Sequence, residues 1–123
     1  MIKYKLLIAE DDPIEKNLFK VFLDKDEFDT LFAKNGLEAL EIIKNGEKID
    51  LVLMDIKMPE MDGFVAGGLI KKLVPDIPII AQSSYTEDIV KNRIDRKVFN
   101  EFLNKPINKN ELFAILNKYL QMH

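Results

Sequence analysis

Four short groups of reactive side chains each follow a hydrophobic run in this chain. They are Glu10-Asp11-Asp12, Asp55, Ser83-Ser84 and Lys105-Pro106. Together they supply carboxylates, hydroxyls and an ammonium group, which suits a hard divalent cation and a phosphoryl group. Because carboxylates crowded into one cleft repel one another unless they are protonated or bound to a metal, the set favours Mg²⁺.

Asp55 is the candidate for covalent chemistry, because it stands alone at the end of a central apolar run. A carboxylate can attack phosphorus and form an acyl phosphate. Phosphoryl transfer asks the protein mainly for positioning and for neutralisation of charge. Lys105 would place a positive charge beside the phosphoryl oxygens, and Ser83 would donate a hydroxyl hydrogen bond to one of them.

Each of these side chains also has an ordinary structural role. Asp12 is better assigned as a helix N-cap than as a ligand, and Asp55 alone would suit a loop. Ser83 and Ser84 are common turn residues, and Lys105 alone would be an ordinary surface lysine. The chemical interpretation is favoured because all the groups occupy equivalent positions after successive apolar runs.

Those apolar runs predict five strands, at residues 6–9, 28–33, 51–54, 77–81 and 102–103. The runs are continuous rather than alternating, which is typical of strands covered on both faces.

Helix signals separate and follow the strands. The first helix is expected to begin with Asp12 as N-cap and Pro13 at the first position, with Glu15 completing a capping box. Its predicted apolar face is Ile14, Leu18, Val21 and Phe22.

The other helices have similar start and stop signals. Asn35 with Glu38 opens the second helix and Gly46 closes it, the third runs from about residue 63 to 73, a fourth begins near Thr86-Glu87, and Asn108 with Glu111 opens the last. The apolar face of the last helix is Leu112, Phe113, Leu116 and Leu120. The Gly67-Gly68 pair inside the third helix should cost about 1 kcal/mol per glycine relative to alanine, and close backbone packing is the only reason the sequence offers.

The totals narrow the class of protein. The chain has 123 residues, 47% hydrophobic and 32% charged, which predicts one soluble domain over residues 1–123. A net charge of −3 with scattered basic residues gives no nucleic-acid footprint, and no stretch is long and apolar enough to span a membrane. The absence of cysteine excludes disulfides and thiolate metal sites and favours a cytoplasmic location.

Alternating strands and helices with short connections predict right-handed crossovers and a parallel sheet with helices on both faces. Ligands of such open sheets bind outside the carboxyl ends of the strands, where the strand order reverses. All four reactive groups lie at those ends, so we expect them to form one pocket.

In order and spacing, three motifs make the chain resemble the receiver domain of two-component response regulators. They are the acidic run at residues 7–12, the stretch from Asp55 to Gly63, and Lys105-Pro106. The resemblance covers essentially the whole chain. It implies an α/β, flavodoxin-like (βα)5 three-layer sandwich, with a parallel five-stranded sheet in the order 2-1-3-4-5.

The resemblance also assigns roles. It implies that Asp55 accepts a phosphoryl group from a histidine kinase or phosphotransfer domain, and that Asp11, Asp55 and the backbone carbonyl of Lys57 ligate Mg²⁺. Glu10 would act on the metal through water, and Lys105 would contact the phosphoryl group. By the same resemblance, Ser83 takes the position of the family's switch hydroxyl and Phe102 that of its rotating aromatic residue. In the family, phosphorylation moves both side chains and so remodels the surface around the fourth helix and fifth strand. The peptide bond before Pro106 is expected to be cis.

The chain departs from the family pattern at Ser84, where a smaller residue is usual, and at residues 94–97, where an Ala-Gly pair is common. Lys57 and Tyr85 occupy positions that tune dephosphorylation in the family. Glu-Asp-Asp followed by proline resembles the receivers of hybrid histidine kinases. With no output domain after His123, we expect either a stand-alone regulator or one domain of a larger protein, acting on an output domain or partner protein.

Two other functions remain open on the sequence alone. A degenerate receiver would serve only as a protein-interaction module, although every chemical position holds a competent residue type. A Mg²⁺-dependent phosphohydrolase would need a second acid near the nucleophile, and residue 57 is lysine. We expect a signalling switch rather than an enzyme, and the family resemblance also allows a phosphorylation-dependent dimer.

Overall fold

Five parallel strands form a single sheet at the centre of the computed structural model, in the order β2-β1-β3-β4-β5. The structure describes residues 3–57, 61–83 and 97–121. The strands are β1 (Tyr4–Ala9), β2 (Phe28–Ala33), β3 (Leu51–Asp55), β4 (Ile79–Ser83) and β5 (Glu101–Asn104). The predicted strand order and fold class are confirmed, and each predicted strand is present with its ends shifted by at most two residues at either side.

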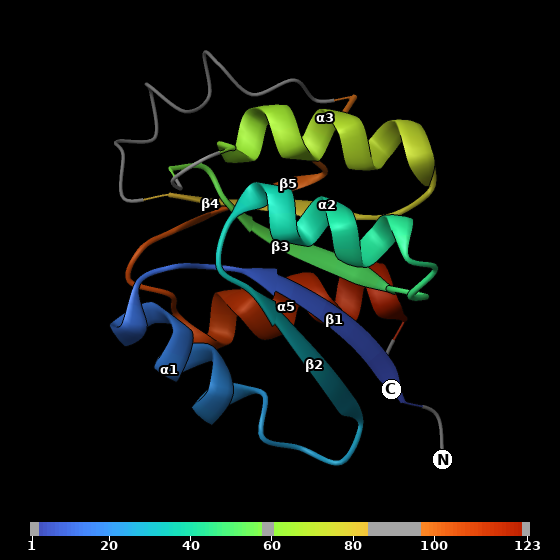
Figure 1. Ribbon diagram of the computed structural model, residues 1–123. Helices are drawn as coiled ribbons and strands as arrows, with labels where there is room; N and C mark the ends of the chain where they lie inside the picture. The colour runs from blue at the N-terminus through green and yellow to red at the C-terminus, as the bar shows by residue number, and fades with distance from the viewer. Residues whose placement is uncertain (1–2, 58–60, 84–96, 122–123) are drawn as a thin grey trace.

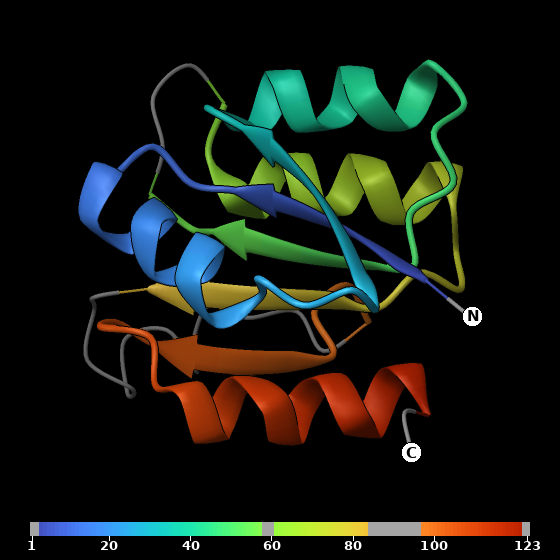
Figure 2. The ribbon, with the colours of Figure 1, turned by 90° about the horizontal axis from the view of Figure 1, so that it is seen from below.

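Four helices cover the two faces of this sheet in the described part of the chain (Figure 1). They are α1 (Pro13–Phe22), α2 (Gly36–Lys44), α3 (Gly63–Leu73) and α5 (Lys109–Leu120). Figure 2 shows α2 and α3 together on one face and α1 and α5 on the other. The fourth predicted helix, near Thr86-Glu87, lies outside the described residues, as do Ser84 and Tyr85.

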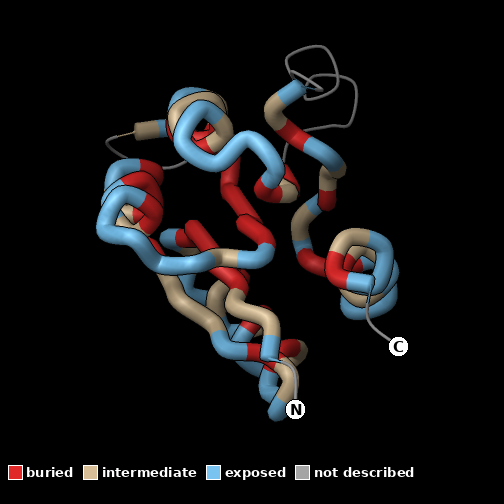
Figure 3. The backbone as a smooth tube through the Cα atoms, turned by 90° about the vertical axis from the view of Figure 1, so that its right-hand side faces the viewer, coloured by how far each residue is buried: buried red, intermediate tan, exposed pale blue. Residues whose placement is uncertain are grey.

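Each face has its own hydrophobic core, because successive residues of a strand point to opposite sides of the sheet. In β3, Val52 and Met54 pack towards α2 and α3, whereas Leu51 and Leu53 pack towards α1 and α5. All of these side chains are buried, and the strands form the red interior of Figure 3. The continuous apolar runs of the sequence are therefore explained by burial on both faces.

The helix N-caps agree with their sequence signals. The side chains of Asp12, Asn35 and Asn108 accept hydrogen bonds from the backbone amides of Ile14, Glu38 and Glu111. Such a bond satisfies one of the free amide groups of the first helical turn. Each cap follows a strand directly or after a short loop, so it fixes the direction in which the chain leaves the carboxyl edge of the sheet.

One prediction about α1 is wrong and another holds only in part, because Leu18 and Phe22 of the predicted apolar face are half-buried and Phe22 packs against the core. Ile14 and Val21 are 73% and 63% exposed, and the buried residues are instead Glu15, Phe19 and Leu23, spaced four apart. The capping box is also absent, because the Glu15 carboxylate accepts a hydrogen bond from the amide of Ile107 at 3.3 Å. A buried glutamate at the inner face thus rotates the helix away from the face that hydrophobicity alone predicts.

Candidate functional site

The candidate site lies at the carboxyl edge of the sheet, where β1, β3, β4 and β5 end. Glu10 and Asp11 follow β1, Asp55 and Ser83 are the last residues of β3 and β4, and Lys105 follows β5. Parallel pairing aligns these ends, since Asp55 is in register with Gln82 and Ser83 with Asn104. The sheet register is therefore what brings together residues separated by up to 95 positions in sequence, from Glu10 to Lys105.

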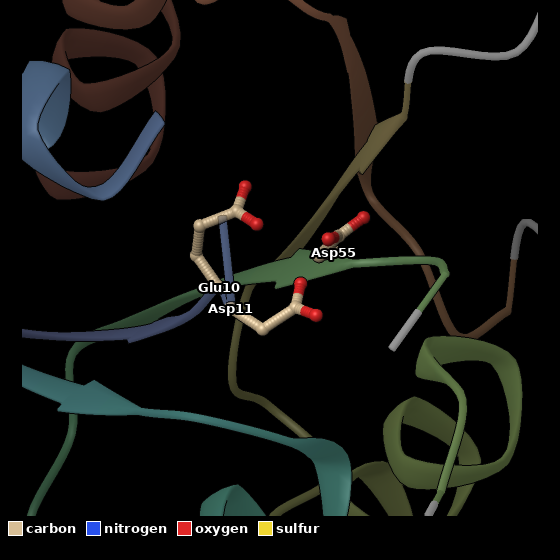
Figure 4. A group of neighbouring side chains, drawn as sticks. All are labelled: Glu10, Asp11 and Asp55. Atoms are coloured by element: carbon tan, nitrogen blue, oxygen red, sulfur yellow. The ribbon is translucent and has the colours of Figure 1, made fainter. Parts of the chain in front are cut away.

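Three carboxylates meet in this site (Figure 4). One carboxylate oxygen from each of Glu10, Asp11 and Asp55 lies within 4.8 Å of the other two. Glu10 and Asp55 are buried, at 1% and 3% exposed, whereas Asp11 is exposed at the mouth. Oxygen donors at this separation suit Mg²⁺, which takes carboxylate ligands and keeps several waters on an accessible side.

Lys105 joins the two buried carboxylates. Its Nζ lies 2.9 Å from Asp55 Oδ2 and 2.7 Å from Glu10 Oε1, and the lysine side chain is only 12% exposed. The Lys105 backbone amide also donates to the Ser83 carbonyl at 2.9 Å, which fixes the lysine beside the end of β4. The peptide bond from Lys105 to Pro106 is cis, as the family resemblance implied.

The remaining carboxylate oxygens are held by backbone amides. The Asp12 amide donates to Glu10 Oε2 at 3.1 Å, and the Lys57 amide donates to Asp55 Oδ1 at 3.2 Å. These bonds fix the orientation of both carboxylates. Asp12 itself caps α1, so it contributes its amide rather than its carboxylate to the site.

The buried charges shift two pKa values. Burial raises the pKa of the Glu10 carboxyl to about 7, and the neighbouring Asp55 adds to the increase while Lys105 opposes it. Burial lowers the pKa of Lys105, but its hydrogen bonds to Glu10 and Asp55 and their negative charges outweigh that effect, so the pKa is raised overall. Lys105 therefore stays cationic, and burial favours the protonated form of Glu10.

At Gly63 the backbone lies so close to Asp55 that no side chain would fit. A Cβ on Gly63 would lie 2.2 Å from the carbonyl oxygen of Asp55, and the Gly63 amide donates to the Ile56 carbonyl at 2.9 Å. The start of α3 therefore packs directly on the end of β3. The sequence motif from Asp55 to Gly63 corresponds to this close approach.

The two expected switch residues lie on neighbouring strands. Ser83 is buried at the end of β4, at 2% exposed. Phe102 is partly buried in β5, in register with Ala81, and packs against the core on the α2 and α3 face. Their backbones thus belong to the same strand pair.

Sequence reasoning missed one buried polar residue next to the site. Gln82 is fully buried, its Nε2 lies 3.5 Å from the Ala9 carbonyl oxygen, and its Oε1 has no hydrogen-bond partner among the described residues. Its only sequence signal is its position directly after the apolar run of β4. Gln82 links the ends of β1 and β4 on the face that also carries Glu10.

Comparisons with known proteins agree with this architecture. Residues 6–117 match the family described as response regulator receiver domain. The chain is 36% identical over 118 residues to the transcription factor SKN7 of Candida albicans, and 35% identical over 115 residues to the autoinducer 1 sensor kinase/phosphatase LuxN of Vibrio campbellii. These matches cover 96% and 94% of this chain but only 21% and 13% of the two relatives.

A solved structure shows the same fold. The receiver domain of the Francisella response regulator 1452 superposes with a TM-score of 0.81 and is 27% identical, over 97% of this chain and 98% of that one. The family match spans most of the sequence, and the site occupies the sheet edge that the motifs indicated. The chain therefore belongs to the family of response regulator receiver domains.

Proposed function

We propose that this receiver domain accepts a phosphoryl group on Asp55 from the phosphohistidine of a histidine kinase or phosphotransfer domain. The observation that carries the proposal is the contact of one largely buried lysine with two buried carboxylates, beside a third carboxylate at the mouth. A nucleophile, a cation for phosphoryl oxygens and a set of oxygen donors for a metal are thus within reach of one another.

In the transfer, an Asp55 carboxylate oxygen attacks phosphorus and a P–O bond forms. The P–N bond to the donor histidine breaks, and the imidazole nitrogen leaves with its electron pair. The Lys57 amide holds the Asp55 carboxylate in place, and Lys105 is close enough to contact the transferred oxygens. Both groups are in place before the donor arrives, so little reorganisation is needed.

The donor set fits a divalent metal. Asp11, Asp55 and the backbone carbonyl of Lys57 would hold Mg²⁺, with Glu10 acting through water. When bound, Mg²⁺ supplies neutralisation of charge and orientation of a phosphoryl oxygen. The exposed position of Asp11 leaves one side of the site open to the donor.

Phosphorylation would be transmitted through Ser83 and Phe102. In this proposal the Ser83 hydroxyl moves towards the phosphoryl group and Phe102 follows, which changes the surface around the fourth helix and β5. The strand pairing of Ala81 with Phe102 supports a link between the two positions. The domain acts as a switch that assists its own phosphorylation and dephosphorylation rather than as an enzyme with an external substrate.

The partners follow from this role. We propose a cytoplasmic receiver that acts on an output domain or partner protein, can form a phosphorylation-dependent dimer, and binds neither nucleic acid nor membrane itself. Within the described residues, no helix has the length and apolar character needed to cross a bilayer.

Modification by a small phosphodonor tests the assignment. Incubation with acetyl phosphate and Mg²⁺ should add one phosphoryl group, seen by intact mass spectrometry, and Asp55→Asn should abolish the addition. The matched control is Asp12→Asn, because asparagine caps a helix as well as aspartate does and Asp12 lies outside the metal site. Asp12→Asn should be modified like the wild type. Modification that persists in Asp55→Asn would refute the assignment of the phosphoacceptor.

A further inference from the structure

The outer surface of α2 and α3 carries most of the exposed apolar side chains in the described residues. Six large hydrophobic residues are exposed in the described part of the chain. Four of them lie on α2 or α3 or directly after α3, namely Leu37, Val65, Leu73 and Val74. The helices lie side by side on one face of the sheet in both ribbon views (Figures 1 and 2). Of these four residues, Leu73 lines a groove between the two helices, and an apolar groove open to solvent is typical of an interaction site.

A groove runs between the two helices. Its volume is about 230 Å³, and it is lined by Leu40, Lys44, Leu69, Lys72 and Leu73. Leu40 and Leu69 form the floor, being buried and partly buried, while Leu73 is 50% exposed at the end of α3. The groove is therefore apolar along its base and basic along its rim.

The contribution of α3 to this surface is one continuous stripe. Val65, Gly68, Leu69, Lys72 and Leu73 are spaced by three and four residues, which places them on one side of the helix. Val65 is 52% exposed, so the stripe stays open to solvent along most of α3. A stripe at this spacing is the complement that a second helix would pack against.

Gly68 is a glycine that this fold does not need. A Cβ at Gly68 would meet no atom of the described residues within 4 Å, whereas a Cβ at Gly67 would lie 2.7 Å from Cζ of the buried Phe99. Packing inside the chain therefore explains Gly67 but not Gly68, although each glycine weakens the helix relative to alanine. A small residue in the middle of an exposed stripe allows the backbone of a partner to approach closely.

The rim charges are uncompensated. Neither Lys44 nor Lys72 has an ion pair or a hydrogen bond among the described residues, whereas the adjacent Lys71 donates to the Ile77 carbonyl at 2.6 Å and to Asn100 at 3.1 Å. The sequence of α3 contains no acidic residue. Lys44 and Lys72 are the only charged side chains among the residues that line the groove, while Glu41 lies one turn before Lys44 on α2 and lines a different hollow.

We propose that the groove between α2 and α3 binds an amphipathic helix that carries acidic residues on both flanks of an apolar stripe. The apolar side chains would fill the groove over Leu40 and Leu69, the helix would pass closest at Gly68, and its carboxylates would pair with Lys44 and Lys72. A second copy of this chain fits less well, since an α3 packed on an α3 would bring lysines into the groove without acids. The surface lies on the helix layer and does not involve the Asp55 site, so this proposal is independent of phosphorylation.

A designed peptide provides the test. The probe has roughly 18 residues, enough to form a helix when bound, with leucines at helical spacing and glutamates on both flanks. The matched peptide has lysine in place of every glutamate. Binding is followed by the backbone amide chemical shifts of the ¹⁵N-labelled protein, and the acidic peptide should shift amides of α2 and α3 while leaving α1 and α5 unchanged.

Variants of the protein locate the contact. Leu73→Ser should weaken binding of the acidic peptide about tenfold, whereas Val21→Ser, at a position on α1 that is even more exposed, should leave it unchanged. Gly68→Leu adds a side chain at a position where a Cβ meets no described atom within 4 Å, so it should weaken binding without loss of folding. Lys72→Glu should lower the affinity for the acidic peptide about fivefold and raise the affinity for the lysine peptide.

Three results would overturn the proposal. The first is equal binding of the two peptides, or shifts outside α2 and α3. The second is concentration-dependent self-association in sedimentation equilibrium that Leu73→Ser removes, which would assign the surface to a second copy. The third is Lys72-dependent binding to vesicles containing phosphatidylglycerol without binding of the acidic peptide, which would assign it to an anionic membrane.

Discussion

Glu10 is the side chain at which burial and charge conflict most strongly. It is 1% exposed, its Oε1 lies 2.7 Å from Lys105 Nζ, and Asp55 is close by. Burial raises its pKa to about 7, so near neutral pH a proton and a metal compete for the same part of the site. The single positive charge of Lys105 is shared by two buried carboxylates, so it can neutralise only one of their two negative charges.

This competition predicts a pH-dependent affinity for Mg²⁺. The proton stabilises the neutral Glu10 and the metal favours the ionised form, so metal binding should weaken as the pH falls below about 7, approaching tenfold per pH unit. The measurement is a Mg²⁺ titration followed by amide chemical shifts at several pH values. Glu10→Gln, which cannot ionise, should bind Mg²⁺ with much less dependence on pH in this range, and an unchanged dependence would show that Glu10 is not the group that titrates.

At the scale of elements, α3 shows how two adjacent glycines differ in their environments. Gly67 faces the core, where Phe99 packs edge-on against Phe64 with ring centroids 6.0 Å apart, and Gly68 faces outward. Packing against Phe99 therefore requires glycine at position 67, whereas no contact among the described residues requires it at position 68. The hydrophobic pattern of α3 does not distinguish them, because the contact at Gly67 comes from a segment more than 30 residues away in sequence.

Single alanine substitutions should therefore change stability in opposite directions. Gly68→Ala should stabilise the protein by about 1 kcal/mol through helix propensity. Gly67→Ala should destabilise it by about 1–2 kcal/mol, because the new Cβ overlaps a buried aromatic ring that has little freedom to move. Urea denaturation of the two variants measures the difference, and similar free energies of unfolding would contradict the assigned packing of Phe99.

At the scale of the whole molecule, the sheet edge is where folding and function are coupled. The carboxylates come from β1 and β3, the lysine follows β5, and the pairing of strands across the sheet holds them together. A ligand that bridges these strand ends binds the folded chain and not the unfolded one. Metal binding should consequently stabilise the entire domain.

Adding Mg²⁺ should raise the free energy of unfolding. At a concentration about a hundredfold above the dissociation constant, the increase is about 2.7 kcal/mol. Asp11→Asn should remove most of the increase while leaving the metal-free protein folded, since Asp11 is exposed. Thermal unfolding with MgCl₂ and with NaCl at the same ionic strength separates metal binding from ionic strength, and equal midpoints would argue against a metal site.

The sequence by itself determined the alternation of strands and helices, three helix caps and the identity of the polar residues at the strand ends, whereas the strand order followed from the family resemblance. These features depend on local signals, such as apolar runs buried on both faces and side chains that cap at Asp12, Asn35 and Asn108. The grouping of Glu10, Asp11, Asp55 and Lys105 could also be predicted, because parallel strands place their carboxyl ends at one edge.

Only the tertiary structure decided what depends on contacts between distant segments. Glu15 faces inward because the Ile107 amide meets its carboxylate, and Ile14 and Val21 are left in solvent as a result. Phe99 explains Gly67, and Gln82 is buried beneath the strand ends. In each case the position of the side chain is fixed by a contact with a residue that is distant in sequence. The hydrophobic periodicity of a single helix or strand carries no information about such a contact.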